Sequence, residues 1–173
     1  EVLPEKPVSQ RTSSRGETSS QSAVRPSATL AARDGIIRKK DLECLALNIY
    51  REAGHEPFEG KVAVAQVTLN RVADPAFPNT VCGVVYEKTA VFSKVICQFS
   101  WYCDANHKNR KINEQAYADS YAVAKKVYLE GFRLDGLNKA LYYHADYVSP
   151  NWKLVRITQI GTHIFYRKPN ENI

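Results

Sequence analysis

The chain has 173 residues, of which 44% are hydrophobic, enough for one domain with a substantial core. Its formal net charge is +6 at pH 7, but the basic residues are scattered and accompany no recognisable nucleic-acid-binding module, so we expect no nucleic acid partner. No apolar run approaches the length of a transmembrane helix, so we expect no membrane span.

Residues 1–34 differ from the rest of the chain in composition, because they are rich in Ser and Thr, contain three prolines and lack aromatic residues. Such a segment cannot bury enough apolar surface to offset the entropy lost on ordering. We therefore predict a flexible N-terminal segment and a folded domain over residues 35–173. The segment either has no role or tethers the domain to a larger assembly. The chain contains no Met, so we expect it to begin after processing.

Helical periodicity predicts a first helix over residues 38–53, closed by Gly54 in the left-handed conformation that often ends helices. Glu52 lies beside the apolar stripe of this helix, close to its end. Partial desolvation there should raise the pKa of the Glu52 carboxyl, so that it can hold a proton near neutral pH. The stripe consists of Leu42, Leu45, Ile49 and Ala53.

A second helix should open at Pro57 and continue to about Val72, because proline is tolerated in a first helical turn. Its sequence is apolar nearly all round, which predicts the central buried helix of the fold. Glu56 and Glu59 fall at its start, where a negative charge suits the helix dipole, and we assign them no further role.

The middle of the chain is less regular, with short extended or helical pieces expected over 81–86 and 91–101. A third long helix follows over residues 114–130, capped by Asn113 and ended by Gly131.

The last third of the chain is strand-like, beginning with a strand over 140–144. Residues 154–160 and 163–167 should form a hairpin around Gly161-Thr162, a loop that suits a type II′ turn. Helices followed by a small antiparallel sheet predict an α+β fold with a groove between the two parts.

The four cysteines do not have the paired spacing of a structural zinc site. Cys44 lies on the buried side of the first helix and is predicted to be a packed thiol. The other three fall near the groove. If the protein is exported, one disulfide among them is expected, with Cys97 and Cys103 nearest in sequence, and one thiol would remain unpaired.

Five segments of the chain are informative as an ordered set, namely residues 49–72, 77–86, 97–101, 142–146 and 161–166. Over about residues 42–167 the chain resembles the SleB/CwlJ cell-wall hydrolase family. The resemblance implies a lysozyme- or transglycosylase-like groove in a catalytic domain over 35–173 that cleaves the glycan strands of peptidoglycan. It also implies that Glu52 is the essential acid.

Hydrolysis of a glycosidic bond normally requires a second carboxylate at a defined separation from the acid. Asp104 and Asp146 are available, but neither stands out as Glu52 does. We therefore favour a lytic transglycosylase that cuts between N-acetylmuramic acid and N-acetylglucosamine, with Glu52 as acid and then base. The alternatives are a muramidase-type hydrolase, a peptidoglycan amidase or peptidase, and an inactive wall-binding or structural component of a virion.

Several polar and aromatic residues are candidates for binding the sugars. Gln98 and Ser100 offer hydrogen bonds to N-acetyl and hydroxyl groups, and Trp101 offers a flat apolar face for a pyranose ring. Each also has a purely structural interpretation. The remaining candidates are Tyr143, His144 and His163.

We expect no metal and no cofactor, because no close ligand triad is visible in the sequence. The expected partner is the peptidoglycan glycan strand. Such a substrate implies export to the periplasm, cell envelope or medium, or service as a virion or lysis protein of a bacteriophage. The additional cysteines favour a version from Gram-negative bacteria or their phages over a spore enzyme.

Overall fold

The computed structural model describes residues 28–170, so most of the predicted N-terminal segment lies outside the described residues. The described part consists of helices and two small antiparallel sheets, which confirms the α+β class. The elements in chain order are α1 (Ala28–Ala53), α2 (Phe58–Ala73), α3 (Val81–Val85), β1 (Lys88–Val91), β2 (Lys94–Cys97), α4 (Ser100–Cys103), α5 (Ala105–Lys108), α6 (Glu114–Tyr128), β3 (Tyr142–Ala145), β4 (Val155–Ile160) and β5 (His163–Arg167).

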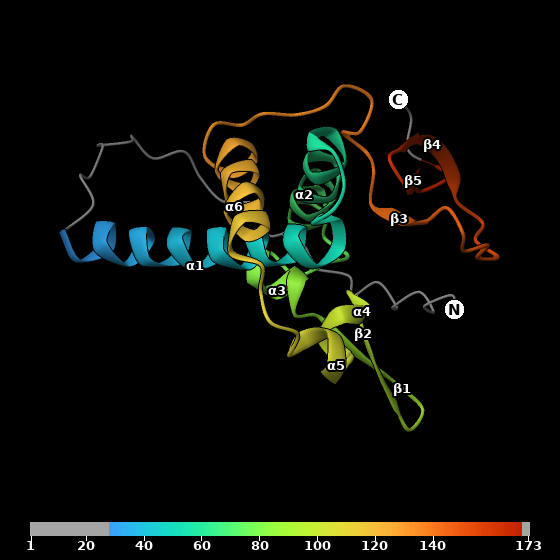
Figure 1. Cartoon of the computed structure of the whole chain (residues 1–173), viewed down its shortest axis with the longest axis horizontal. Helices are drawn as coiled ribbons and strands as arrows, with labels where there is room; N and C mark the ends of the chain where they lie inside the picture. The colour runs from blue at the N-terminus through green and yellow to red at the C-terminus, as the bar shows by residue number, and fades with distance from the viewer. Residues whose placement is uncertain (1–27, 171–173) are drawn as a thin grey trace, which may run out of the picture.

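The long helix α1 is the base on which the other helices pack (Figure 1). Helices α2 and α6 stand side by side on one side of it, and α3, α4, α5 and the β1–β2 hairpin lie on the other. The second sheet has the strand order β3-β5-β4 and lies beyond α2. No helix in the described residues is long and apolar enough to cross a membrane.

Helix α1 begins ten residues earlier than the periodicity predicts, at Ala28 instead of Arg38. Residues 28–34, which the composition assigns to the flexible segment, are therefore helical. Every side chain from residue 32 to residue 40 is exposed, Ile36 and Ile37 included, so this extension has no buried face and no apolar stripe of helical period marks it. Burial starts at Asp41, and the predicted stripe of Leu42, Leu45, Ile49 and Ala53 is buried.

Helix α2 lies between two hydrophobic cores, as its all-round apolar sequence predicts. Val62 and Ala65 belong to the larger core, which α2 shares with α1, α3 and α6. Ala63 and Val67 belong to a smaller core, which α2 shares with Phe165 of the second sheet. Residues 62–68 are all buried. The helical part and the sheet are thus packed on opposite sides of one helix.

The predicted role of Gly54 is wrong, because only Gly131, Gly136 and Gly161 among the described glycines have a positive φ. Gly54 is required for its size instead. A Cβ atom there would lie 2.5 Å from the backbone oxygen of Tyr50. The chain turns at once from α1 into α2, with the Glu56 amide donating to the Ala53 carbonyl at 3.0 Å.

The predicted hairpin is confirmed, with β4 and β5 paired in an antiparallel register across Gly161-Thr162. Gly161 has φ +58°, whereas Thr162 does not have a positive φ, which is the sign pattern of the expected type II′ turn.

All four cysteines form disulfides, so the prediction that Cys44 is a free packed thiol is wrong. Cys44 is bonded to Cys82, because α3 packs across α1 and brings the two Cα atoms to 5.3 Å. The expected Cys97–Cys103 bond is present and closes the segment from the end of β2 to the end of α4.

The two disulfides should differ in their contribution to stability. They span sequence separations of 38 and 6 residues, for which loop-closure entropy gives about 4 and about 2 kcal/mol. Urea unfolding of the double variants Cys44→Ser/Cys82→Ser and Cys97→Ser/Cys103→Ser should show the larger loss in the first. An equal or reversed order would contradict this entropic account.

Candidate active site

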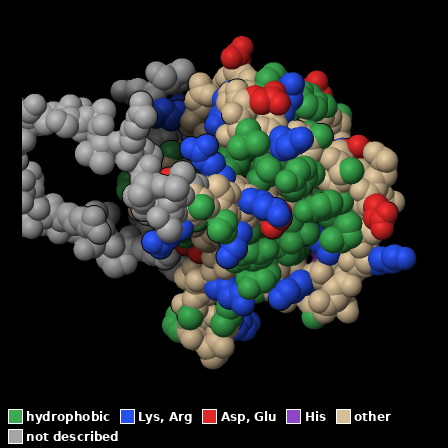
Figure 2. All heavy atoms as spheres, turned by 90° about the vertical axis from the view of Figure 1, so that its left-hand side faces the viewer, with side chains coloured by type: hydrophobic (Ala, Val, Ile, Leu, Met, Phe, Trp, Pro, Cys, Tyr) green, Lys and Arg blue, Asp and Glu red, His purple; other side chains and the backbone are tan. Residues whose placement is uncertain are grey.

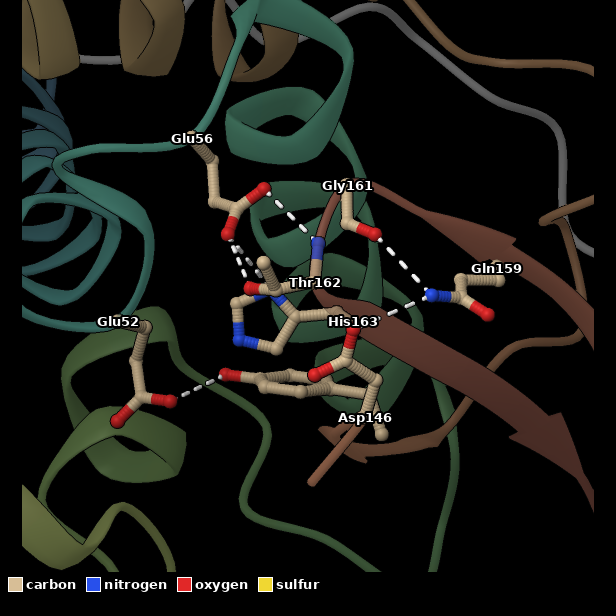
Figure 3. Close-up of polar contacts among 8 residues, drawn as sticks. Glu52, Glu56, Asp146, Gln159, Gly161, Thr162 and His163 are labelled. Atoms are coloured by element: carbon tan, nitrogen blue, oxygen red, sulfur yellow. Dashed lines mark hydrogen bonds and ion pairs between the residues drawn. The ribbon is translucent and has the colours of Figure 1, made fainter. Parts of the chain in front are cut away.

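Glu52 lies in the last turn of α1, half-buried, where the helix end faces the second sheet. The hydroxyl of Tyr143 donates a hydrogen bond to its Oε2 at 2.9 Å, drawn as the dashed line from Glu52 in Figure 3. Tyr143 comes from β3, 91 residues further along the chain. The contact therefore joins the helical part to the sheet at the position where the sequence places the acid.

The surroundings of Glu52 favour its protonated form. Burial raises the pKa of its carboxyl above the usual 4.5, while the hydrogen bond from Tyr143 and the positive charge of Arg71 oppose that rise. Burial also raises the pKa of Tyr143 well above 10.0, so its phenol stays protonated and remains a donor. A raised pKa for Glu52 is what its position beside the apolar stripe of α1 predicts.

Arg71 of α2 acts on the Glu52 carboxyl, although Arg71 is assigned no role from the sequence. Its side chain is buried, and its Nε donates to the Leu141 carbonyl at 2.7 Å. The guanidinium lies over the rings of Phe77 and Phe99, with centroid distances of 5.4 and 5.2 Å. A cation near the end of the helix predicted to be the central buried one is the signal that could have identified it, since a buried charge needs a specific reason.

Glu56 is the second acidic residue here, and the expectation that it has no role beyond the helix dipole is wrong. Its carboxylate lies beside Gly60 at the start of α2 and reaches the β4–β5 turn, where both oxygens accept hydrogen bonds from Thr162. The His163 ring follows, with Nδ1 at 4.0 Å from Oε1 of Glu56. A contact across 106 residues has no local sequence signal.

His163 is buried and forms part of the wall beside Glu52. Its ring meets that of Tyr143 edge-on, with the centroids 5.1 Å apart. Burial lowers the pKa of His163 below its usual 6.5, against the opposing charges of Glu56 and Asp146, so the ring is neutral at neutral pH. Of the predicted sugar-binding residues, the structure brings Tyr143 and His163 together at the acid.

Trp101 does not present a face for a sugar, contrary to the prediction. Its side chain is only 2% exposed, and its Nε1 donates to Oδ1 of Asn48 at 2.9 Å, which fastens α4 to α1. Gln98 is half-buried and Ser100 is exposed at the start of α4, so their predicted contacts with sugars stay predictions.

His144 follows Tyr143 in β3 and therefore points to the opposite face of the sheet. There it stacks on Tyr166, with its Nε2 at 2.8 Å from the Tyr166 hydroxyl, and meets the edge of Trp152. The structure thus separates His144 from Glu52 and gives it aromatic partners of its own.

The two aspartates considered as second carboxylates have other contacts. Asp104 caps α5 by accepting from the amides of Asn106 and His107. Asp146 lies beside His163 in Figure 3 and accepts from Gln159 at 3.5 Å. Neither contacts Glu52 through a hydrogen bond.

Within residues 28–170, no group of three or more His, Cys, Asp or Glu side chains is placed to hold a metal ion. On the face seen in Figure 2, Lys and Arg side chains are dispersed among hydrophobic ones and do not gather into one patch. On this face the positive charge is dispersed, as the scattered basic residues of the sequence suggest.

Comparison of the sequence with known protein families identifies the family to which this chain belongs. The pattern of the cell wall hydrolases matches residues 55–166. The chain belongs to the cell wall hydrolase family. The matched range begins after Glu52, so the role of Glu52 stays a prediction.

The curated proteins that resemble this chain include spore cortex-lytic enzymes. The protein from Bacillus subtilis is 33% identical over 147 residues, which is 83% of this chain and 43% of the relative. The one from Bacillus cereus is 36% identical over 131 residues, covering 73% of this chain and 44% of the relative. The chain thus spans less than half the length of these curated relatives.

Two solved structures match the fold. The catalytic domain of the Bacillus cereus SleB protein is 32% identical, with a TM-score of 0.54, and the match covers 75% of this chain and 91% of that domain. The catalytic domain of the germination-specific lytic transglycosylase SleB from Bacillus anthracis is 33% identical, with a TM-score of 0.55, covering 75% and 95%. The chain therefore corresponds to the catalytic part of such proteins.

The raised pKa of Glu52 predicts that Glu52→Gln stabilises the fold at neutral pH. The stability contributed by the protonated carboxyl is fully present below pH 4.5 and is lost as the pH rises through the folded-state pKa, whereas an amide cannot ionise. Thermal melts between about pH 4 and about pH 8 should show the variant melting increasingly above the wild type. The exposed Glu59→Gln should show no such trend. A pH-independent difference for Glu52→Gln would contradict the raised pKa.

Proposed function

We propose that this chain cleaves the glycan strands of peptidoglycan between N-acetylmuramic acid and N-acetylglucosamine, as a lytic transglycosylase with Glu52 as acid and base. The observation that carries the proposal is a half-buried carboxyl with a raised pKa, contacted by Tyr143 and next to the buried Arg71. Membership of the cell wall hydrolase family supports the substrate.

The chemistry follows from the two charge states of one carboxyl. Protonated Glu52 donates its proton to the glycosidic oxygen while the bond from that oxygen to the anomeric carbon breaks. The resulting carboxylate accepts the hydrogen bond from Tyr143 and lies in the positive field of Arg71, both of which stabilise the anion. It then takes the proton of the 6-hydroxyl of the muramic acid, whose oxygen bonds to the anomeric carbon, and the anhydro-sugar is released without water.

Transglycosylation is favoured over hydrolysis because the two aspartates that the sequence offers as second carboxylates, and Glu56, have partners of their own. Both oxygens of Glu56 bond to Thr162, Asp104 caps a helix, and Asp146 is turned toward Gln159. A hydrolase that inverts or retains configuration would need a second carboxylate to activate water or attack the sugar. The description of the Bacillus anthracis relative as a lytic transglycosylase supports the same choice.

The site of action proposed for this chain is outside the cytoplasm. Peptidoglycan lies there, and two disulfides persist in oxidising compartments and not in a reducing cytosol. Within that location, the periplasm, the cell envelope, the medium and a bacteriophage lysis or virion particle are the alternatives for this chain, while the curated relatives are spore cortex-lytic enzymes. The tethering role of the N-terminal segment concerns residues outside those described and stays a prediction.

The role of Glu52 predicts that Glu52→Gln is folded and inactive. The amide has nearly the same shape but cannot donate a catalytic proton, so the rate of wall solubilisation should fall by about three orders of magnitude. Turbidity loss of purified cell walls measures that rate, and Glu59→Gln serves as the matched control because it removes an exposed carboxylate nearby. Activity of Glu52→Gln within a few-fold of the control would remove Glu52 from the mechanism.

Digestion in water enriched in heavy oxygen should leave no label in the products. Transglycosylation forms the new bond with an oxygen of the sugar itself, whereas hydrolysis puts one solvent oxygen into each new reducing end. Mass spectrometry of the released muropeptides reads this directly. Labelled reducing ends would support the muramidase alternative, and new free amines without cleaved glycan would support an amidase or peptidase. Walls that bind the protein without any product would indicate a binding component.

A further inference from the structure

We propose that Glu56 is a positioning residue that sets the contact between Glu52 and Tyr143 by fastening the β4–β5 turn to the α1–α2 turn. The inference rests on the proposed function, since it assigns a second residue to the same site. Glu56 itself need not touch the substrate. It acts through the strand that carries Tyr143.

The bond between Glu56 and the turn uses the whole carboxylate. The amide of Thr162 donates to Oε2 at 3.2 Å, and the Thr162 hydroxyl donates to Oε1 (Figure 3). Hydrogen bonds to an ionised acceptor are stronger than those between neutral groups. The Glu56 side chain is only 11% exposed, so water competes weakly for these oxygens.

The turn is shaped around this carboxylate. Gly161 has φ +58°, and a Cβ atom there would lie 1.8 Å from Oε2 of Glu56. Only a residue without a side chain leaves the space that the carboxylate occupies. The close approach and the positive φ both require glycine at the same position, which marks the turn and the acid as one unit.

Two routes lead from this turn to Tyr143. Along the backbone, the Thr162 carbonyl accepts from the amide of Asp146 at 2.8 Å, just beyond the end of β3. Along the side chains, His163 follows Thr162 and its ring meets Tyr143 at 5.1 Å. Strand β3 pairs with β5 in a register that puts Ala145 opposite His163 and Tyr143 opposite Phe165. A displacement of the turn would therefore move Tyr143.

The backbone of Glu56 is held close to Glu52, at the end of α1. Glu56 follows Glu52 by four residues, and its amide donates to the carbonyl of Ala53, the last residue of α1. Glu56 thus joins the end of the helix that carries the acid to the sheet that carries the donor. It adds a direct link between the two ends of the Glu52–Tyr143 hydrogen bond, beside the packing of α2 and the hydrogen bonds of Asn70 and Arg71 to the backbone before β3.

Different charged and polar groups act on the Glu52 carboxyl and on the His163 ring. The groups that act on the Glu52 carboxyl are Tyr143 from β3 and Arg71 from α2. Those that act on the neutral ring of His163 are Glu56, Asp146 and His144. Glu56 bonds to the neutral Thr162, and the His163 ring beside it is uncharged. Its role is therefore to hold the turn.

The test compares Glu56→Ala with Glu59→Ala, which removes an exposed carboxylate from the same helix start. Initial rates on solubilised glycan strands should give a kcat lower by about 10- to 100-fold for Glu56→Ala, with KM changed by less than about threefold, because misplacement of a catalytic group affects the chemical step. Glu59→Ala should match the wild type. Equal kcat values for the two variants would overturn the proposal.

The pH profile separates positioning from a loss of folded protein. The Tyr143 hydrogen bond lowers the pKa of Glu52, so its loss should move the alkaline limb, where the acid loses its proton, to higher pH. Tyr143→Phe should show this shift, Glu56→Ala should show it in part, and the double variant should shift no further than Tyr143→Phe. A Glu56→Ala limb at the wild-type pH, or an additive shift in the double variant, contradicts the proposal.

Thr162 supplies a second pair of variants that does not disturb the helices. Thr162→Ser keeps the hydroxyl that Glu56 accepts and should retain the wild-type kcat, whereas Thr162→Val removes it and should lose activity in the same sense as Glu56→Ala. Equal activity of the two would overturn the proposal even if Glu56→Ala does not fold. Failure of the proposed function is distinguishable, because it appears in an active Glu52→Gln or in the products of the wild type, whatever the Glu56 and Thr162 variants do.

Discussion

The fold depends on the burial of α2 on both of its sides. One side packs on Leu45 and Ile49 of α1, and the other packs on Phe165 of the sheet. A helix buried in this way fixes the separation of the two parts that it touches, because interiors are close-packed and tolerate little adjustment. The acid comes from one of these parts and its hydrogen-bond donor from the other, so the geometry of the site is a product of this packing.

The polar residues of α2 extend this control to the backbone that leads into β3. Gln66 bonds to both the amide and the carbonyl of Leu134, and Asn70 donates to the carbonyls of Leu137 and Ala140. Together with the bond from Arg71 to Leu141, they satisfy backbone groups of a loop that has no regular structure of its own and buries only Leu137, Ala140 and Leu141. Tyr143 follows this loop directly, so buried polar groups in the central helix decide where its hydroxyl lies.

The sequence predicts those features that are repeated along the chain or local to a turn. The apolar stripe of α1, the all-round apolar character of α2 and the Gly161 turn are of this kind, and they suffice for the fold class and for the position of Glu52. The features that the sequence does not reveal depend on contacts between distant segments. Cys44 meets Cys82 because α3 crosses α1, Trp101 is buried where its indole donates to Asn48, and Glu56 bonds to a turn 106 residues away. Each residue type is ordinary for its local position, so only tertiary packing distinguishes its role.

The Cys44–Cys82 disulfide forms only where the surroundings are oxidising. The long helix that bears the acid is covalently tied to α3 only after two thiols have lost their hydrogens to an oxidant. While thiol buffers keep the cysteines reduced, the chain lacks both of its cross-links. A wall-degrading enzyme built in this way would reach its most stable form only after leaving the reducing cytoplasm, so the redox state of its surroundings would limit its action inside the producer.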